Sequence, residues 1–462
     1  MPRAPESRAG AYVSGNRPCE IFQARHQIAS KQKLLVVFIL LHYDAREVRH
    51  NQPMALNRRM NTAETAIKAN GRIPSWIWLH SGLFLSAMKM DFNFDLVTLA
   101  VPLLAISFGA SSLQLGLLGA LQRFLYILIC PISGRLSDHW GRKGLAVSGA
   151  VLFGATCLAL AQARNVVSIA WVIPWVGITL GLFWPALQGW LSDQGESQLR
   201  QSTSLFNLFW SAGSMLGMVL AGILMRFSSQ LPFYVAAGVA ASIAVVLARS
   251  SHEKHRTVSS SPSSNFGTLP AESSWDQAQR RAALTSIFMA YLVVGGVTTQ
   301  FPKLATQLGY GTSWIGFTMG VLPLSRTIGF AVFDRSKAAS SISSPLILVK
   351  LLLALAMAMF VIANSSITFM LSFALLGLVS AATFSFSQYL CLKNPVHAGR
   401  RIGYHESSML GGIVIGSILS GLLAQNLGVR FAFAFGILFS ILSLTAQPSL
   451  FHGYTRRAAD SA

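Results

Sequence analysis

The sequence predicts an all-helical membrane protein with twelve transmembrane helices in two pseudo-symmetric six-helix halves. Three observations lead to this fold class. The chain is 52% apolar and only 11% charged, with a mean hydropathy of +0.51, whereas a soluble protein carries about 25% charged residues. Its apolar residues gather in runs of about 20, the length that a helix needs to cross a bilayer. Glycine patterns also recur between the two halves at a nearly constant spacing.

The N-terminal region, 1–75, differs from the rest of the chain. It is rich in Arg and Lys, and its only apolar run, 34–41, is too short to span a bilayer. Three interpretations stay open: a disordered basic tail, a targeting segment, or an extension ahead of a true start at Met54 or Met60. The fold prediction therefore rests on the residues that follow.

Twelve apolar segments follow this tail and are the predicted membrane spans. They are 78–107, 113–133, 144–163, 167–191, 203–226, 231–249, 282–306, 313–333, 345–364, 367–391, 405–426 and 429–449. A Ser-rich polar linker over 250–280 separates an N-terminal half, 76–249, from a C-terminal half, 281–451. A short C-terminal tail over 452–462 completes the predicted organisation.

Basic residues are distributed unequally over the predicted loops. One set of connections contains most of them, including Arg142 and Lys143. The opposite set contains little beyond Arg164, Arg226, Lys303 and Arg430. Because loops rich in Lys and Arg stay on the cytoplasmic side, the first set should face the cytoplasm. We therefore expect a multi-pass protein of the cytoplasmic membrane with both termini in the cytoplasm.

An internal repeat supports two related halves. Three glycines of the fifth span recur 199 residues later in the eleventh, which gives the set Gly213, Gly217, Gly222, Gly412, Gly416 and Gly421. Gly116 of the second span likewise corresponds to Gly316 of the eighth, at an offset of 200. Duplication of a six-helix unit leaves such a pattern. We expect the six glycines to be helix-packing positions, where small residues allow close approach.

A short polar segment between the second and third spans carries a family resemblance. Residues 134–144 read Gly-Arg-Leu-Ser-Asp-His-Trp-Gly-Arg-Lys-Gly. This segment resembles the loop Gly-x-Leu-Ala/Ser-Asp-Arg/Lys-x-Gly-Arg-Arg/Lys of the major facilitator superfamily of secondary transporters, although His139 stands where the family has Arg or Lys. The resemblance implies that the segment is a cytoplasmic gate that latches one conformation; a solvated turn is the alternative. The matching gate positions are Gly134, Asp138, Gly141, Arg142 and Lys143.

Four charged residues inside the predicted spans are candidates for proton coupling. Asp91 and Asp95 lie four residues apart and hence on one helix face, while Arg123 and Arg326 occupy similar places in the two halves. Charges inside a membrane normally face protein or a water-filled cavity. We expect Asp95 first and Asp91 second to take up and release a proton, with Arg123 favouring the ionised form. A static ion pair that neutralises two charges is the alternative.

Further polar and aromatic residues are candidates for the substrate cavity: Gln188, Asn207, Trp210 and Gln388. Polar side chains inside spans need partners, which makes the amides better candidates than the aromatic ring. The glycines of the fifth span resemble the antiporter motif of the superfamily, Gly-x-x-x-Gly-Pro-x-x-Gly-Gly, but Met218 replaces its proline and Ala221 one of its glycines. These departures weaken a drug-antiporter interpretation.

Other function classes find little support. The net charge of +20 resides mainly in short loops and the N-terminal tail, so we expect no nucleic-acid partner. The four cysteines show no metal-ligand spacing, and no phosphate-binding Gly-rich loop precedes Lys-Ser/Thr. We therefore expect no enzymatic activity, no cofactor and no metal site.

The predicted function is secondary active transport of a small-molecule solute across the lipid bilayer by alternating access, coupled to protons, with a lean towards efflux. We expect a monomer. Two alternatives stay open: an uptake symporter or uniporter for a sugar or organic anion, and a non-transporting sensor or assembly factor on a transporter fold.

Overall fold

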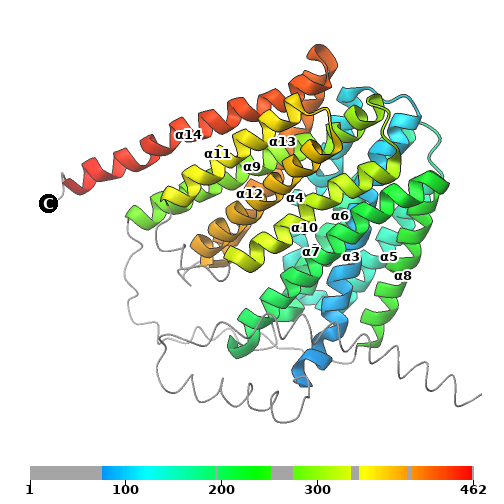
Figure 1. Ribbon diagram of the computed structural model, residues 1–462. Coiled ribbons are helices and arrows are strands. Elements are labelled where there is room, and N and C mark those ends of the chain that lie inside the picture. Colours follow the sequence, from blue (N-terminus) through cyan, green and yellow to red (C-terminus); the bar gives the residue numbers. More distant parts are fainter. Residues whose placement is uncertain (1–74, 193–195, 251–273, 334–342, 393–397, 460–462) are drawn as a thin grey trace, which may run out of the picture. The chain divides into compact units, whose positions relative to one another are not determined.

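The computed structural model describes residues 75–192, 196–250, 274–333, 343–392 and 398–459, and every regular element in these ranges is a helix (Figure 1). The helices are α3 (Ser75–Ser107), α4 (Ser112–Trp140), α5 (Arg142–Ala161), α6 (Val166–Ser192), α7 (Glu196–Phe227), α8 (Leu231–Arg249), α9 (Ser274–Gln307), α10 (Thr312–Phe333), α11 (Ser343–Ile362), α12 (Ser366–Leu392), α13 (Ala398–Leu427) and α14 (Val429–Ala459).

The predicted spans and the helices agree one to one, which confirms the all-α fold class. Nine segments of the described helices are long and apolar enough to cross a membrane by length and composition. Shorter apolar stretches lie in α11 and α14, over Ile347–Ile362 and Val429–Leu444. A bundle with this many apolar helices buries all backbone hydrogen bonds within each segment, as a membrane-spanning chain must.

Several helices extend beyond the predicted spans, and α9 and α14 do so by the most residues. Helix α9 begins at Ser274, inside the range predicted as linker, because Ala, Gln and Arg over 275–283 are good helix formers although they are not apolar. Helix α14 continues to Ala459, past the predicted start of the C-terminal tail. The predicted N-terminal tail and residues 251–273 of the linker lie outside the described residues.

Tight turns connect the helices at one end of the bundle. Gly109 has φ 78° and follows α3, and its N–H donates to Ile106 at 2.9 Å while Ala110 donates to Ala105 at 3.0 Å. This Schellman arrangement requires a left-handed residue, for which glycine is the least strained. The same turn recurs 200 residues later at Gly309, with φ 81°. We call this side of the bundle the Gly109 end and the opposite side, where Gly141 joins α4 to α5, the Gly141 end.

Within each half, glycines bring two helices into backbone contact. The four contacting pairs are Gly213 with Met88, Gly217 with Phe92, Gly412 with Phe288, and Gly416 with Leu292. A methyl group at any of these glycines would meet the backbone of the facing helix. Helix α7 therefore packs on α3 as α13 packs on α9, and the contacts are related by the same offset of about 200 residues. This correspondence is the pseudo-symmetry predicted from the glycine pattern.

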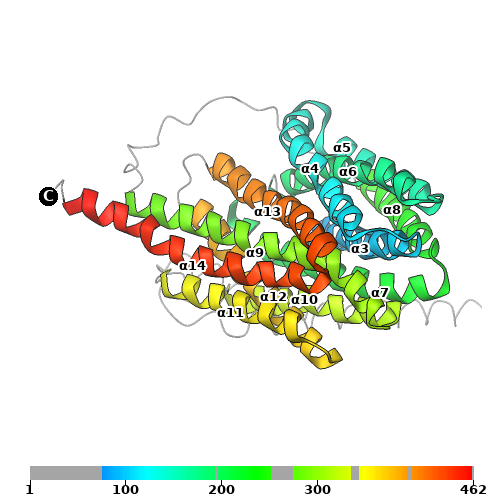
Figure 2. The same cartoon turned by 90° about the horizontal axis from the view of Figure 1, so that it is seen from above.

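Two further glycine contacts join the halves near the Gly109 end. Gly116 of α4 meets Gly421 of α13, and Gly222 of α7 meets Gly316 of α10. Figure 2, seen from above, shows α5, α6 and α8 on one side and α9, α11 and α14 on the other, with α7 alongside α10. The two glycine pairs occupy equivalent positions in the two halves, because their members differ by about 200 residues.

Polar side chains from α9 add to the contact between the halves at the Gly109 end. Lys303 Nζ donates to the backbone carbonyl of Ala110 at 3.1 Å. Gln300 Nε2 donates to the carbonyl of Ser112 at 3.0 Å. Both bonds run from the second half to the connection between α3 and α4, so the Gly109 end is held by hydrogen bonds as well as by close packing.

Candidate functional site

Three of the four predicted intramembrane charges are buried in the bundle. Asp91 and Asp95 are 4% and 8% exposed on α3, and Arg123 is 7% exposed on α4. The fourth, Arg326 on α10, is half-buried. Both arginines lie close enough to both carboxylates to interact electrostatically. The structure thus brings together the four charges that the sequence placed on separate helices, α3 and α4 in one half and α10 in the other.

A serine connects the charges across the two halves. Ser214 Oγ on α7 donates a hydrogen bond to Asp95 Oδ2. Arg326 Nη2 on α10 donates to the same Ser214 Oγ at 3.1 Å. Ser214 is 1% exposed and Asp95 is 8% exposed, so the hydrogen bond between them is buried. A carboxylate in one half is therefore linked to a guanidinium in the other half through one hydroxyl group.

An aromatic cluster surrounds this link. The guanidinium carbon of Arg326 lies 4.6 Å from the ring centroid of Trp210, within the range of a cation–π interaction. Trp210 also packs on Phe330 and Phe384, with ring centroids 6.4 and 6.2 Å away, and it forms a side-chain interaction with Asp91. Because Trp210 belongs to α7 and the two phenylalanines to α10 and α12, the cluster spans both halves.

Arg123 has different partners from those expected. Its guanidinium carbon lies 5.1 Å from the ring centroid of Phe94, and its Nη1 donates to Gln122 Oε1 at 3.4 Å. Among the described side chains neither arginine forms a direct ion pair with Asp91 or Asp95, and Arg326 exerts the stronger electrostatic effect on both. Arg326, not Arg123, is thus the principal basic neighbour of the aspartates.

Some polar atoms of this cluster are buried without a hydrogen bond. They are Asp91 Oδ2, Arg326 Nε and both amide atoms of Asn93. A buried polar atom without a partner costs about 1–3 kcal/mol, and more when it is charged. Asp91 in the charged form is therefore expensive, and a proton on its carboxyl would reduce this penalty.

The motif at 134–144 lies at the Gly141 end. Gly141 adopts φ 87° as the single residue between α4 and α5. Arg142 donates to the carbonyl of Gly189 near the end of α6, and Lys143 Nζ donates to the carbonyl of Ser250 after α8 at 2.8 Å. These cations bind at the negative ends of two helices, which is favourable. Gly134 lies within α4, and the side chain of Asp138 lies outside the described residues.

The other predicted cavity residues are not gathered at the charge cluster. Asn207 is half-buried on α7, one turn before Trp210. Gln388 is half-buried on α12, one turn after Phe384, and Gln188 is exposed on α6. Of these four candidates, Trp210 is the one whose described side chain contacts the cluster, at Asp91 and Arg326.

Two residues of the site were missed by the sequence interpretation. Ser214 carries little signal on its own, because serine is common in membrane helices, but its place four residues after Trp210 sets both on one face of α7. Gly189 is the second: a Cβ there would lie 3.2 Å from the guanidinium carbon of Arg142, so a larger residue would displace this guanidinium from its place at the α6 carbonyl.

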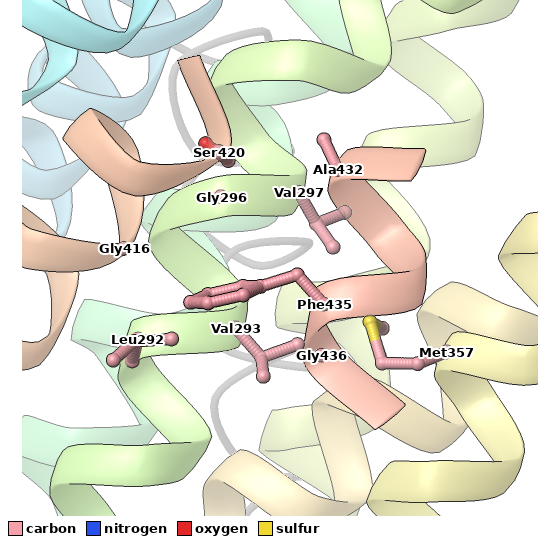
Figure 3. Close-up of a pocket in the computed structure, with 10 residues that line it drawn as sticks. All are labelled: Leu292, Val293, Gly296, Val297, Met357, Gly416, Ser420, Ala432, Phe435 and Gly436. Carbon is pink, nitrogen blue, oxygen red and sulfur yellow. The ribbon is translucent and has the colours of Figure 1, made fainter. Parts of the chain in front are cut away.

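A small pocket lies away from the charges, among α9, α11, α13 and α14 of the second half (Figure 3). Its lining includes Gly296, Met357 and Phe435, and none of the lining residues is charged. Among the described residues no group of three or more His, Cys, Asp or Glu side chains could hold a metal ion. The buried charges between the halves are thus the candidate functional site.

A bundle of helices in two related halves, with charged side chains between them, is an arrangement that many membrane transporters share. The family model of the Major Facilitator Superfamily matches residues 83–395, and the chain belongs to this family. It is a multi-pass membrane transporter, and membership implies a small-molecule solute.

Relatives in sequence match only part of the chain. A putative uncharacterized MFS-type transporter of Mycobacterium tuberculosis is 25% identical over 136 residues, which are 29% of this chain and 32% of that protein. The quinolone resistance protein NorA of Staphylococcus aureus is 26% identical over 157 residues, 33% of this chain and 40% of that protein. The chain therefore matches less than half the length of these relatives.

Solved transporter structures match most of the chain in fold. The nucleoside transporter NupG has a TM-score of 0.65 at 13% identity and covers 81% of this chain and 99% of its own. A bacterial homolog of the human lysosomal transporter Spinster, in an inward-facing and unoccupied conformation, has a TM-score of 0.66 at 12% identity, covering 83% and 98%. These similarities establish the fold predicted from the sequence.

Proposed function

We propose that this protein is a proton-coupled secondary transporter that exports a small solute across the cytoplasmic membrane by alternating access. The observation that carries the proposal is the buried link from Asp95 through Ser214 to Arg326, because it joins the two halves by charge. In alternating access the halves rock against each other around a central site. A titratable group at their contact couples a proton to that motion.

The coupling step takes place at Asp95. The ionised carboxylate accepts the Ser214 hydrogen bond and attracts Arg326, which holds α3 and α7 against α10. A proton on Asp95 removes its charge, so the attraction to Arg326 falls to that of a neutral hydrogen-bond chain. The halves then separate more easily at this point. Asp91, one turn away with one oxygen lacking a hydrogen bond, is the second proton acceptor.

The proposed orientation places the Gly109 end outside the cell and both termini in the cytoplasm. Most loop basic residues lie at the Gly141 end, as the positive-inside rule requires for a cytoplasmic face. Two of the basic residues at the Gly109 end bind backbone: Lys303 at Ala110, and Arg430 Nη1 at the carbonyl of Val361 at 2.9 Å. Because these two side chains bind backbone carbonyls of neighbouring helices, their position at the Gly109 end is compatible with an extracellular location of that end.

Two further parts of the proposal rest on the family motif and a relative. The motif with Asp138, Arg142 and Lys143 would latch the cytoplasmic side, with the last two residues anchoring it to α6 and α8. The relative named for quinolone resistance supports the efflux direction. The transporter acts as a monomer, since each chain contains both halves of the bundle.

The test is solute-driven proton movement in inverted membrane vesicles. A preset pH gradient is followed with a fluorescent dye while lipophilic cations, sugars and organic anions are added in turn. We expect one class to dissipate the gradient with the wild-type protein and to have no effect with Asp95→Asn. Leu85→Ala, at an exposed apolar position of the same helix, serves as the control for expression of a variant altered on α3.

Three outcomes would contradict parts of the proposal. Solute movement that stops at equal concentrations and is not accompanied by proton movement would support a uniporter. Proton movement that persists in Asp95→Asn would remove this carboxyl from the coupling step. No response to any solute class, with the protein present in the vesicles, would favour a non-transporting sensor or assembly factor.

A further inference from the structure

Helix α3 has a second polar face, which the proposed function does not use. This face consists of Ser86, Lys89 and Asn93, which follow one another at intervals of three and four residues and therefore share one side of the helix. Asn93 is close to Asp91 in sequence, but a turn of about 100° per residue places the two side chains about 160° apart around the helix. The cation and the amide thus point away from the aspartates.

This face of α3 packs against α8, and we call their contact the α3–α8 seam. A Cβ at Gly82, one turn before Ser86, would lie 3.6 Å from Ser250 Oγ at the end of α8. Further along the seam, Lys89 Nζ donates to Ser242 Oγ of α8 at 3.1 Å. The Ser242 hydroxyl donates in turn to a backbone carbonyl of its own helix at 2.7 Å. The serine therefore accepts from the ammonium and holds it at the seam.

Several hydrogen-bond donors in the seam have no acceptor among the described residues. Ser86 and Asn93 are both 0% exposed, and neither the Ser86 hydroxyl nor the Asn93 amide forms a hydrogen bond. Lys89 is half-buried within the apolar segment Ser81–Ser107, and Ser242 accepts from one of the three N–H groups of its ammonium. Helix α8 contains no acidic residue that could neutralise this charge. Buried donors without acceptors and a cation without a counter-charge are both costly inside a membrane.

The equivalent seam of the second half is apolar. The offset of 200 residues that relates α3 to α9 places Met289 at the counterpart of Lys89 and Val293 at the counterpart of Asn93. Val293 lines the small uncharged pocket among α9, α11, α13 and α14 (Figure 3). The two-half fold therefore accepts apolar residues at these positions, so the cation and the amide of the first half indicate a bound ligand.

We propose that Lys89, Asn93 and Ser86 bind a small monovalent inorganic anion, of the size of a halide, between α3 and α8. The ammonium supplies the counter-charge, the amide N–H and the hydroxyl donate to the anion, and Ser242 positions the ammonium. Because Ser86 and Asn93 are fully buried, the ligand must fit between the helices, which suits a small ion better than a lipid headgroup. The site goes beyond the proposed function and does not rest on it.

The experiment uses the purified full chain in detergent, with bromide as the probe anion and gluconate to keep the ionic strength constant. Equilibrium dialysis measures bound bromide, and tryptophan fluorescence follows thermal unfolding. We expect the wild type to bind one bromide ion per chain, and its unfolding midpoint to rise with bromide concentration, since a ligand of the folded state stabilises that state. Lys89→Met and Asn93→Val match the residues of the second half and should fold, but each should weaken bromide binding about tenfold or more.

The matched control is Arg249→Gln, which removes an exposed cation from the last turn of α8. This variant should bind bromide like the wild type, because the anion is held by buried donors and not by the surface charge of the helix. If Arg249→Gln weakens binding as much as Lys89→Met does, the attraction is diffuse and the α3–α8 seam is not the site.

Two further results would overturn the inference. The first is a wild-type chain that binds no bromide, or a Lys89→Met variant that binds as much as the wild type. The second is an unfolding midpoint that ignores bromide but rises with added phosphatidylglycerol in the wild type and not in Lys89→Met, which would assign the seam to a lipid headgroup. None of these results bears on proton-coupled transport, because the seam and the aspartates lie on different faces of α3.

Discussion

The contact between Gly222 and Gly316 leads to a prediction about the balance between conformations. The change is Gly316→Ala, which adds one methyl group where α7 and α10 meet. That Cβ would lie 2.8 Å from the carbonyl oxygen of Met218, and 2.9 and 3.0 Å from the Cα and N of Gly222. All three neighbours are backbone atoms, so no side chain can rotate out of the way.

The expected size of the effect follows from these distances. Carbon atoms rest at about 3.5–4.0 Å, so the two helices must separate by at least about 0.5 Å. Overpacking of this kind costs about 1–3 kcal/mol. The cost applies only to the conformation in which the Gly109 end is closed, so the equilibrium should shift towards the open form by about 5- to 150-fold.

Pulsed electron paramagnetic resonance measures this shift directly. Spin labels at Ser229→Cys and Gln425→Cys, in a chain without its native cysteines, report the separation of the halves at the Gly109 end. We expect a larger population at long distance in Gly316→Ala. The control is Gly238→Ala on α8, where a Cβ would meet nothing within 4 Å. Identical distance distributions in the two variants would refute the idea that this glycine contact closes the bundle.

Two further substitutions test the polar contacts between the halves. Ser214→Ala removes the hydroxyl between Asp95 and Arg326, which leaves the buried carboxylate with one hydrogen bond fewer at a cost of about 1–3 kcal/mol. We expect this variant to slow proton-coupled transport, while circular dichroism should show that its helical content is retained. Unchanged transport rates would contradict the role of this serine. Lys303→Met removes the hydrogen bond to the carbonyl of Ala110, which is worth about 0.5–1.5 kcal/mol, and should raise the population of the open conformation in the same spin-label experiment. A closed population equal to that of the parent chain would show that this hydrogen bond does not hold the Gly109 end closed.

Most of the fold could be predicted because the membrane imposes simple requirements. A helix must be about 20 residues long to cross the bilayer, so the apolar runs locate the spans. Helix ends outside the apolar runs were less predictable. Residues 274–281 form the start of α9 although most of them are polar, since helix formation depends on backbone propensity as well as on hydropathy.

The site could be predicted only in part. The intramembrane charges were visible because such residues are rare and costly. Their partners were not, because Ser214 and Trp210 contact Arg326 only through packing between α7 and α10, which is a tertiary event. The link between Arg326 and Asp95 through Ser214 also depends on which side chain reaches the serine across the interface.

The connections at the Gly109 end have a practical consequence. All six lie within the described residues, and each contains between one and four residues. None is long enough to fold over an entering molecule as a lid. Substitutions that change which solutes enter at the Gly109 end must therefore be made on the helix surfaces. Grafting the loops of another transporter onto this end would not transfer that transporter's selectivity. Epitope tags or fluorescent inserts at these turns would pull apart helices whose spacing depends on single residues such as Gly428.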